Sequence, residues 1–245
     1  MNLIEVAEAT STNTLAASMP DAPHGTVIRA IAQTAGRGQR GNSWESESGK
    51  NLTVSIVVRP DNILAYEQFL ICRAVSVALV QLLDRVLPGG IHAEIKWPND
   101  IYVSDKKICG ILIENSLTGI TIDRSILGVG LNVNQREFLS DAPNPVSIIN
   151  INGGVELDLV PLVNMLWELV DENLSLCSSD EGRRKLTENY DSRLWRRSGF
   201  HTFAYPDGQH FEASIKSIAD NGVMTLQLRD GSTQSFAFKE VQFVL

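Results

Sequence analysis

The sequence has little cysteine and no histidine cluster. Its three cysteines, Cys72, Cys109 and Cys177, are widely spaced, odd in number and include no CxxC pair, so they do not match a disulfide framework. They are predicted to be reduced core thiols. The four histidines, at positions 24, 92, 201 and 210, lack metal-ligand spacing, which argues against a histidine-held metal centre.

Long apolar runs are also missing, and no targeting leader is expected. The most hydrophobic stretch, 74–83, is far shorter than the roughly 20 residues that cross a bilayer and has charged residues on both sides. Glu5 and Glu8 stand where a signal peptide would have its apolar core. The sequence therefore predicts a cytoplasmic protein with no membrane partner.

Positive charge is not in excess. The chain has 21 Lys and Arg against 29 Asp and Glu, a formal charge of -8, and a general nucleic-acid binder needs a basic face. No nucleic-acid partner is therefore expected. With 43 % hydrophobic and 20 % charged residues, the composition is typical of a globular protein that has one domain of about 180 to 200 residues and a small appendage, or two equal domains.

Several enzyme signatures are absent. There is no GxSxG, HExxH or GxxxxGK[ST] motif, which argues against hydrolase and P-loop chemistry. Gly36, Gly38 and Gly41 formally match GxGxxG, but residues 42–50 are polar and unpatterned where a dinucleotide site needs a helix. The segment is better interpreted as a mobile loop whose arginines reach an anion. The structural alternative is a plain surface loop with solvated arginines.

Strands and helices are segregated along the chain. One long buried helix is predicted over 64–87, and two further helices begin at the caps Asp158 and Asp180. From Gly199 onward the pattern alternates and three turn pairs interrupt it, which predicts a small antiparallel β-barrel. Strand-like runs of mixed or antiparallel pairing occur at 27–32, 52–58, 91–95, 108–113 and 125–131. The fold class expected is α+β.

Two polar clusters and a glycine-rich strand could form a site. Segments 96–100 and 106–110 resemble the two lips of a hairpin, and Pro98 would fix the direction of its neighbours. Segment 128–134 alternates glycine with apolar residues, as happens where backbone approaches a ligand closely. Taken singly, these features also fit a surface salt bridge and a bulge. Together with the loop arginines they suit a nucleoside triphosphate and a carboxylate, and so predict acyl-adenylate formation.

Five segments, 10–13, 33–44, 96–100, 107–114 and 128–132, occur in the same order as in biotin protein ligases. The whole chain resembles that family in its short bacterial form. The resemblance implies a catalytic domain over 1–195 that is similar to class II aminoacyl-tRNA synthetases, and an SH3-like domain over 196–245. Because only nine residues precede Thr10, no DNA-binding domain and hence no repressor role is expected.

The resemblance also implies site residues. Those expected to bind biotin are Ser11, Thr12, Asn13, Gln33, Gly36, Arg37, Gly38, Arg40, Lys107, Gly110, Gly128 and Gly130. Those expected to bind the nucleotide are Arg37, Arg40, Gly41, Trp44, Lys96, Asn99, Lys107 and Asn132. The expected catalytic residues are Arg37 and Lys107 for charge stabilisation and Asp100 for the acceptor amine. No metal ligand is assigned.

The implied reaction uses ATP with Mg²⁺ to convert biotin into biotinyl-5'-adenylate. A lysine of the biotin carboxyl carrier domain of a biotin-dependent carboxylase then takes the biotinyl group. A homodimer is possible. Many relatives carry an arginine where this sequence has Gln39, which puts adenylate retention in doubt.

Two other functions stay open. A lipoate–protein ligase shares the adenylation step, although the hydroxyls and amides of 11–13 and Gln33 favour the ureido group of biotin. A non-catalytic biotin sensor would bind without turnover, and Gln39 would be its evidence.

Overall fold

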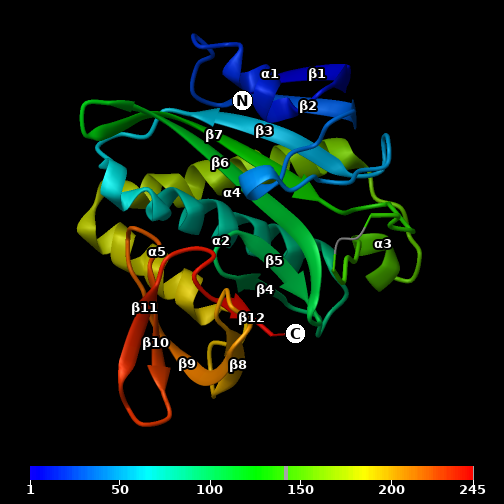
Figure 1. Ribbon diagram of the computed structural model, residues 1–245. Coiled ribbons are helices and arrows are strands. Elements are labelled where there is room, and N and C mark those ends of the chain that lie inside the picture. The colour runs from blue at the N-terminus through cyan, green and yellow to red at the C-terminus, as the bar shows by residue number, and fades with distance from the viewer. Residues whose placement is uncertain (141–142, 245) are drawn as a thin grey trace.

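A seven-stranded mixed sheet forms the larger part of the computed structural model, which describes residues 1–140 and 143–244 (Figure 1). The strand order is β1-β2-β3-β7-β6-β5-β4, with β1 parallel to β2 and the other neighbours antiparallel. The strands are β1 (Asn2–Ala9), β2 (Thr26–Gln33), β3 (Leu52–Val58), β4 (Ala93–Lys96), β5 (Asp100–Val103), β6 (Lys106–Thr118) and β7 (Thr121–Leu131). The predicted mixed sheet is confirmed.

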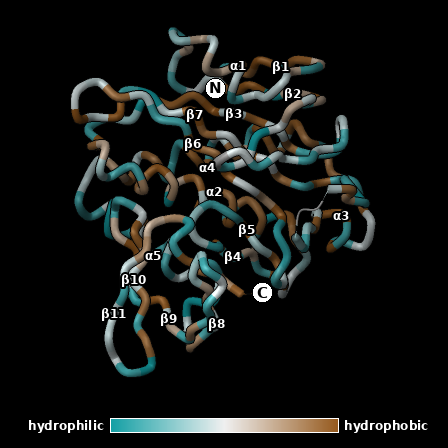
Figure 2. Tube along the Cα trace, viewed as in Figure 1, coloured by the Kyte–Doolittle hydropathy of each residue, from teal (hydrophilic) through white to brown (hydrophobic). Residues whose placement is uncertain are grey.

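Helices pack on both faces of this sheet. On one face, a small cluster forms between the short helix α1 and Ile28, Val57 and Ile126. The other face carries the main core, in which α2 packs against α4 and α5. Figure 2 shows hydrophobic residues along α2 and the central strands. The helices are α1 (Thr12–Ala17), α2 (Phe69–Val86), α3 (Ile148–Ile151), α4 (Leu159–Ser175) and α5 (Asp180–Ser192), with short 3-10 turns η1 (Gln39–Gly41), η2 (Ala65–Glu67) and η3 (Leu176–Ser178).

The long predicted helix is confirmed in its type and its burial. Fourteen of the 18 residues of α2 are buried, and the helix therefore has apolar residues on nearly all sides and not along one stripe only. It starts at Phe69 rather than at residue 64, because η2 occupies the preceding turn. The Asp158 cap of α4 is confirmed, since its carboxylate accepts a bond from the Val160 amide. The cap of α5 is Ser179, one residue before the predicted Asp180, because the Ser179 hydroxyl accepts the Gly182 amide.

A second, five-stranded antiparallel sheet follows α5 and has the order β11-β10-β9-β8-β12. Its turns contain Gly208, Gly222 and Gly231, each with φ of +86°, which glycine adopts without strain. These turns and the antiparallel pairing confirm the small β-structure predicted for the C-terminal part. The strands are β8 (His201–Ala204), β9 (His210–Ile218), β10 (Met224–Leu228), β11 (Thr233–Phe236) and β12 (Gln242–Phe243).

The second sheet is docked on the start of α2 through buried polar contacts. Arg73, only 1 % exposed, donates to the Ile218 carbonyl at 2.6 Å and pairs with the Asp220 carboxylate. The Phe69 amide donates to the Asp220 carbonyl, and the Trp97 indole donates to the Gly222 carbonyl at 3.0 Å. These contacts fix the turn between β9 and β10 next to the 96–100 turn.

The three cysteines are free and buried, as predicted. Burial raises the pKa of the Cys72 thiol to about 12 and that of Cys177 to about 11. No helix in the part of the chain that the structure describes is long and apolar enough to cross a membrane.

Candidate active site

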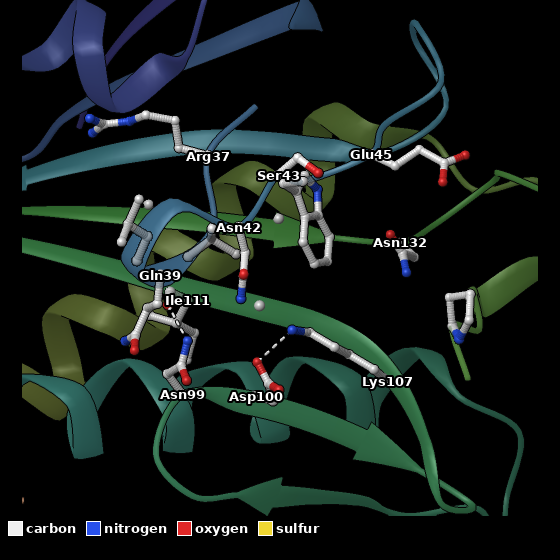
Figure 3. Close-up of a pocket in the computed structure, with 18 of the residues that line it drawn as sticks. Arg37, Gln39, Asn42, Ser43, Glu45, Asn99, Asp100, Lys107, Ile111 and Asn132 are labelled. Carbon is white, nitrogen blue, oxygen red and sulfur yellow. Dashed lines mark hydrogen bonds and ion pairs between the residues drawn. The ribbon is translucent and has the colours of Figure 1, made fainter. Parts of the chain in front are cut away.

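A cavity of about 1010 Å³ lies on the α1 face of the large sheet (Figure 3). Its floor is formed by β6 and β7, and the glycine-rich loop 36–44 forms one wall. The 96–100 turn and the edge of the second sheet, including Phe238 and Phe243, complete the opposite wall. Segments far apart in the sequence therefore enclose one space.

Three glycines in the floor of the cavity leave space for neighbouring side chains. Gly110 and Gly130 pair across β6 and β7, and the Trp44 indole lies directly over both. A Cβ at Gly110 would come within 3.0 Å of the indole, and one at Gly130 would overlap it. A Cβ at Gly128 would overlap the Asn13 amide. The three predicted floor glycines all line the cavity, and each leaves room for a specific neighbour.

One end of the cavity is lined by amides and hydroxyls. The Asn13 amide nitrogen donates to Glu114 at 2.7 Å and to the Leu112 carbonyl at 3.2 Å, while its oxygen accepts from Ser55 at 2.5 Å. The Ser55 hydroxyl lies 2.8 Å from the Thr12 hydroxyl. These bonds hold the end of α1 against β3 and β6 in a fixed orientation.

Gln33 joins the same network from β2. Its side-chain oxygen accepts the Thr12 amide at 2.8 Å. Ser11, the N-cap of α1, is 3 % exposed and lines the cavity. The four residues predicted to contact the ureido and ring part of biotin are thus brought together. Sequence reasoning assigned no role to Ser55, whose only signal is a hydroxyl within a fully buried strand.

An ion pair marks the other end of the cavity. The Lys107 ammonium lies 2.7 Å from the Asp100 carboxylate, and Figure 3 shows both pointing into the space below the loop. The Lys107 nitrogen is 5.6 Å from the centre of the Trp44 ring. Segments 96–100 and 106–110, which were predicted to flank a hairpin, therefore lie next to each other. The reason is that β5 pairs with β6, so that Asp100 faces Gly110.

Aromatic side chains surround the Lys96 ammonium. The ammonium donates to the Tyr102 hydroxyl at 2.8 Å and lies 5.5 Å from the Trp195 ring and 6.0 Å from the Phe243 ring. Burial lowers the pKa of Lys96, although the nearby Asp100 carboxylate opposes this effect. The side chain lines the cavity at the junction with the second sheet.

Two asparagines present side chains to the cavity. The Asn99 amide nitrogen donates to the Ile111 carbonyl at 2.8 Å, and that of Asn132 donates to the Val146 carbonyl at 3.0 Å. Asn132 is 2 % exposed, and its side-chain oxygen has no hydrogen-bond partner among the described residues. A buried acceptor without a partner is costly, so this oxygen is suited to receive a donor from a ligand.

Glu45 connects two loops around the cavity and was not predicted. Its carboxylate accepts the Leu139 amide at 2.9 Å and the Ser140 amide at 2.8 Å, and Gln135 donates to it at 3.0 Å. Burial opposes ionisation of Glu45, but these hydrogen bonds outweigh it and lower the pKa. Trp44 and the 138–140 wall are consequently tied together.

The loop glycines and arginines have different positions. Gly36 does not line the cavity; its carbonyl accepts the Trp44 amide at 2.9 Å, at the base of the loop. The Arg37 guanidinium contacts Glu114 at 2.6 and 2.7 Å and points away from Lys107 (Figure 3). The Arg40 side chain is not among those described. Gly38 and Gly41 line the cavity as predicted.

The loop does not continue into an α-helix. A single 3-10 turn, η1, follows Gly38, and the next long element is β3. This confirms that the GxGxxG match is not a dinucleotide fingerprint, because no α-helix begins after the glycines to receive a pyrophosphate at its N-terminus.

The cavity offers no preformed metal centre. Among residues 1–140 and 143–244, no group of three or more His, Cys, Asp or Glu is placed to hold an ion. Asp100 already pairs with Lys107, and Glu45 is committed to backbone amides. No residue is therefore assigned as a ligand of Mg²⁺.

Comparisons with known proteins agree with this geometry. The bifunctional ligase/repressor BirA of Bacillus spizizenii is 30 % identical over 219 residues, which cover 86 % of this chain and 64 % of BirA. The biotin–[acetyl-CoA-carboxylase] ligase of Paracoccus denitrificans is 33 % identical over 165 residues, covering 66 % of this chain and 62 % of that protein. The chain thus spans less than two thirds of the length of these relatives.

The fold is similar to that of solved structures. Biotin protein ligase from Aquifex aeolicus, in complex with biotin and ATP, superposes with a TM-score of 0.80 over 99 % of each chain, at 22 % identity. The family model described as "Biotin/lipoate A/B protein ligase family" matches residues 3–132, which include the amide-lined end, the glycine-rich loop, the Asp100–Lys107 pair and the glycine floor. This chain belongs to the biotin/lipoate A/B protein ligase family.

Proposed function

We propose that this protein ligates biotin to a specific lysine of a biotin carboxyl carrier domain, using ATP, through biotinyl-5'-adenylate. The observation that carries the proposal is a single cavity with two chemically different ends. One end is lined by the hydroxyls and amides of Ser11, Thr12, Asn13 and Gln33, and the buried Ser55 hydroxyl orients Thr12 and Asn13. The other holds the Lys107 ammonium. A neutral ureido ring and a carboxylate on one ligand match these two ends.

In the first step the biotin carboxylate attacks the α-phosphate of ATP and pyrophosphate leaves. Two anions must approach each other, so a fixed cation lowers the barrier. Lys107 is assigned this role. To reach the ligand, the Lys107 ammonium leaves its ion pair with Asp100 and contacts the biotin carboxylate and the α-phosphate instead.

The nucleotide is assigned to the space beneath the loop. The unpartnered Asn132 oxygen supports an adenine contact there, and the Trp44 indole supplies an aromatic surface. Asn99 and Lys96 line the same region. We also assign Gly41 and Arg40, through the loop, to this part of the site. Mg²⁺ enters only as the ion that accompanies ATP, and no residue is assigned to it.

In the second step the ε-amine of the carrier lysine attacks the adenylate, and AMP leaves. The amine must lose a proton in order to react. Asp100 becomes available once Lys107 has turned to the ligand. We assign Asp100 to orient this amine or to accept its proton.

The molecule is proposed to consist of a catalytic domain, 1–195, and an SH3-like domain, 196–245. Phe238 and Phe243 line the cavity, which supports a contribution of the second domain to the site. The three buried cysteines are free thiols, which supports a cytoplasmic location because thiols stay reduced there. A homodimer remains a prediction, as does the absence of nucleic-acid and membrane partners, and sedimentation at several concentrations tests the dimer.

The direct test is pyrophosphate release from Mg-ATP in the presence of biotin, of lipoate or of neither acid. The intact mass of an added carrier domain is measured afterwards. We expect release that depends on biotin, and a mass gain equal to biotin less water. Release with lipoate alone would change the substrate but keep the reaction. Biotin binding without release would indicate a sensor and would overturn the proposal.

A further inference from the structure

Glu114, on β6, connects two parts of the site with a single carboxylate. One of its oxygens accepts both Asn13, at 2.7 Å, and Arg37, at 2.6 Å. The other oxygen accepts the same Arg37 nitrogen at 2.7 Å. The amide-lined end and the glycine-rich loop therefore share one acceptor group.

Arg37 is placed at the base of the loop. It forms an antiparallel bridge with Ser43, and the Gly38 amide donates to the Asn42 carbonyl at 2.7 Å. The segment between them, 39–41, is the short 3-10 turn η1 that projects over the cavity. Because the base is narrow, fixing Arg37 also fixes where the tip lies.

We propose that Glu114 is a positioning residue that holds the glycine-rich loop closed over biotin and its adenylate by anchoring Arg37 next to Asn13. This inference rests on the proposed function. It gives Arg37 the role of a loop anchor, in place of the direct phosphate contact expected from the sequence. Charge stabilisation at the phosphate then falls to Lys107.

The exposure of the pair supports a role in loop position more than in folding. The side chains of Arg37 and Glu114 are 45 % and 40 % exposed, and solvated ion pairs contribute little to the stability of a fold. A contribution of that size still changes the populations of an open and a closed loop several-fold. The effect of Glu114 should therefore appear in ligand retention and not in unfolding.

The test compares Glu114→Ala and Glu114→Gln with the wild type and with Glu188→Gln. Glu188 forms an exposed pair with Arg184 on α5, far from the cavity, and serves as the matched control. The escape rate of biotinyl-adenylate is measured by filtration after a single turnover without acceptor. We expect about fivefold faster escape in Glu114→Ala, a partial effect in Glu114→Gln, which keeps an acceptor oxygen, and none in the control.

Trypsin provides a readout that does not need catalysis. Cleavage after Arg37 or Arg40 reports how often the loop opens. In the presence of biotin, cleavage should be about fivefold faster in Glu114→Ala than in the wild type. The urea midpoint should stay the same in both, which excludes a general loss of stability.

A double-mutant cycle shows whether Glu114 acts through Arg37. If it does, Arg37→Ala and the double variant Arg37→Ala/Glu114→Ala release adenylate at similar rates. Additive effects of the two changes would overturn the inference, as would wild-type escape in Glu114→Ala. If the wild type itself releases no pyrophosphate with biotin, the proposed function fails instead, and the two failures are distinguishable.

Discussion

At the scale of single residues, the glycine floor sets the height of the cavity. We expect Gly130→Ala to push the Trp44 indole off the floor, because the added Cβ would overlap it. Biotin-dependent pyrophosphate release should fall at least about tenfold, since a displacement near 1 Å disturbs reacting groups strongly. Gly89→Ala is the matched control, because a Cβ there meets nothing within 4 Å. Equal rates in the two variants would contradict this assignment of the floor.

Asp100 is the residue whose role separates the two half-reactions. In Asp100→Ala, transfer of biotin from preformed adenylate to the carrier should slow by about 10² or more, the usual size of a general-base contribution. The transfer is followed by the mass of the carrier after addition of synthetic biotinyl-adenylate. An unchanged transfer rate would show that the role assigned to Asp100 is wrong.

Lys107→Gln should affect the earlier step. Removing the ammonium that pairs with Asp100 is expected to lower the rate of adenylate formation by about 10² to 10³, comparable to the loss of a preorganised charge-stabilising donor. Binding of biotin alone, measured by calorimetry, should weaken less than the rate falls. A loss confined to biotin affinity would contradict a role at the phosphate.

The sequence predicted individual site residues unevenly, for a physical reason. Gly128, Gly130 and the 96–100 turn are recognisable because the pattern within one segment carries the signal, whereas Gly110 was expected only from the family resemblance. Ser55 and Glu114 were missed because their importance comes from contacts with Asn13, 42 and 101 positions away. Such contacts depend on how strands are ordered in the sheet, which spacing along the chain does not encode.

At the scale of elements, buried and periodic segments were predictable while marginal ones were not. β3 and α2 have nearly continuous apolar patterns because both lie inside the core. β1 has no buried residue, and α1 spans only six residues, so neither carries an apolar period. Strand β5 was missed because its four residues follow a tight turn directly.

The junction between α2 and the second sheet is the element contact most open to a stability test. We expect Arg73→Ala to lower the free energy of unfolding by about 2 to 3 kcal/mol, because the Ile218 carbonyl loses a buried donor and a void remains. The exposed pair variant Arg184→Ala should change it by less than about 0.5 kcal/mol. Urea unfolding measures both, and a similar small change in each would contradict the assigned role of Arg73.

At the scale of the whole molecule, the buried thiols predict how stability depends on pH. The pKa of Cys72 is raised to about 12 and that of Cys177 to about 11, from 9.0, chiefly by burial. The folded state therefore holds its thiol protons more tightly than the unfolded state. The contribution of these thiols to the free energy of unfolding is therefore fully present below about pH 9. It falls between pH 9 and the raised pKa values, by at most about 1.4 kcal/mol per pH unit for each thiol.

The measurement is a series of urea unfolding curves from pH 8 to pH 10.5. Cys177→Ser should show a shallower fall than the wild type above pH 9, because one raised thiol is gone. Native-state alkylation at pH 8 should be slow at all three cysteines for the same reason. A flat stability profile up to pH 10.5 would contradict the raised pKa values.

The contact between the start of α2 and the second sheet has a consequence for how the molecule can be divided. The Asp220 carbonyl receives the first amide of α2, and the Gly222 carbonyl receives the indole of Trp97, beside the turn that carries Asp100. A chain cut before β8 would leave these donors, and the buried guanidinium of Arg73, without acceptors. We therefore expect the proposed boundary near residue 196 to separate two parts of the architecture but not two autonomous folding units, so that both parts melt in one transition.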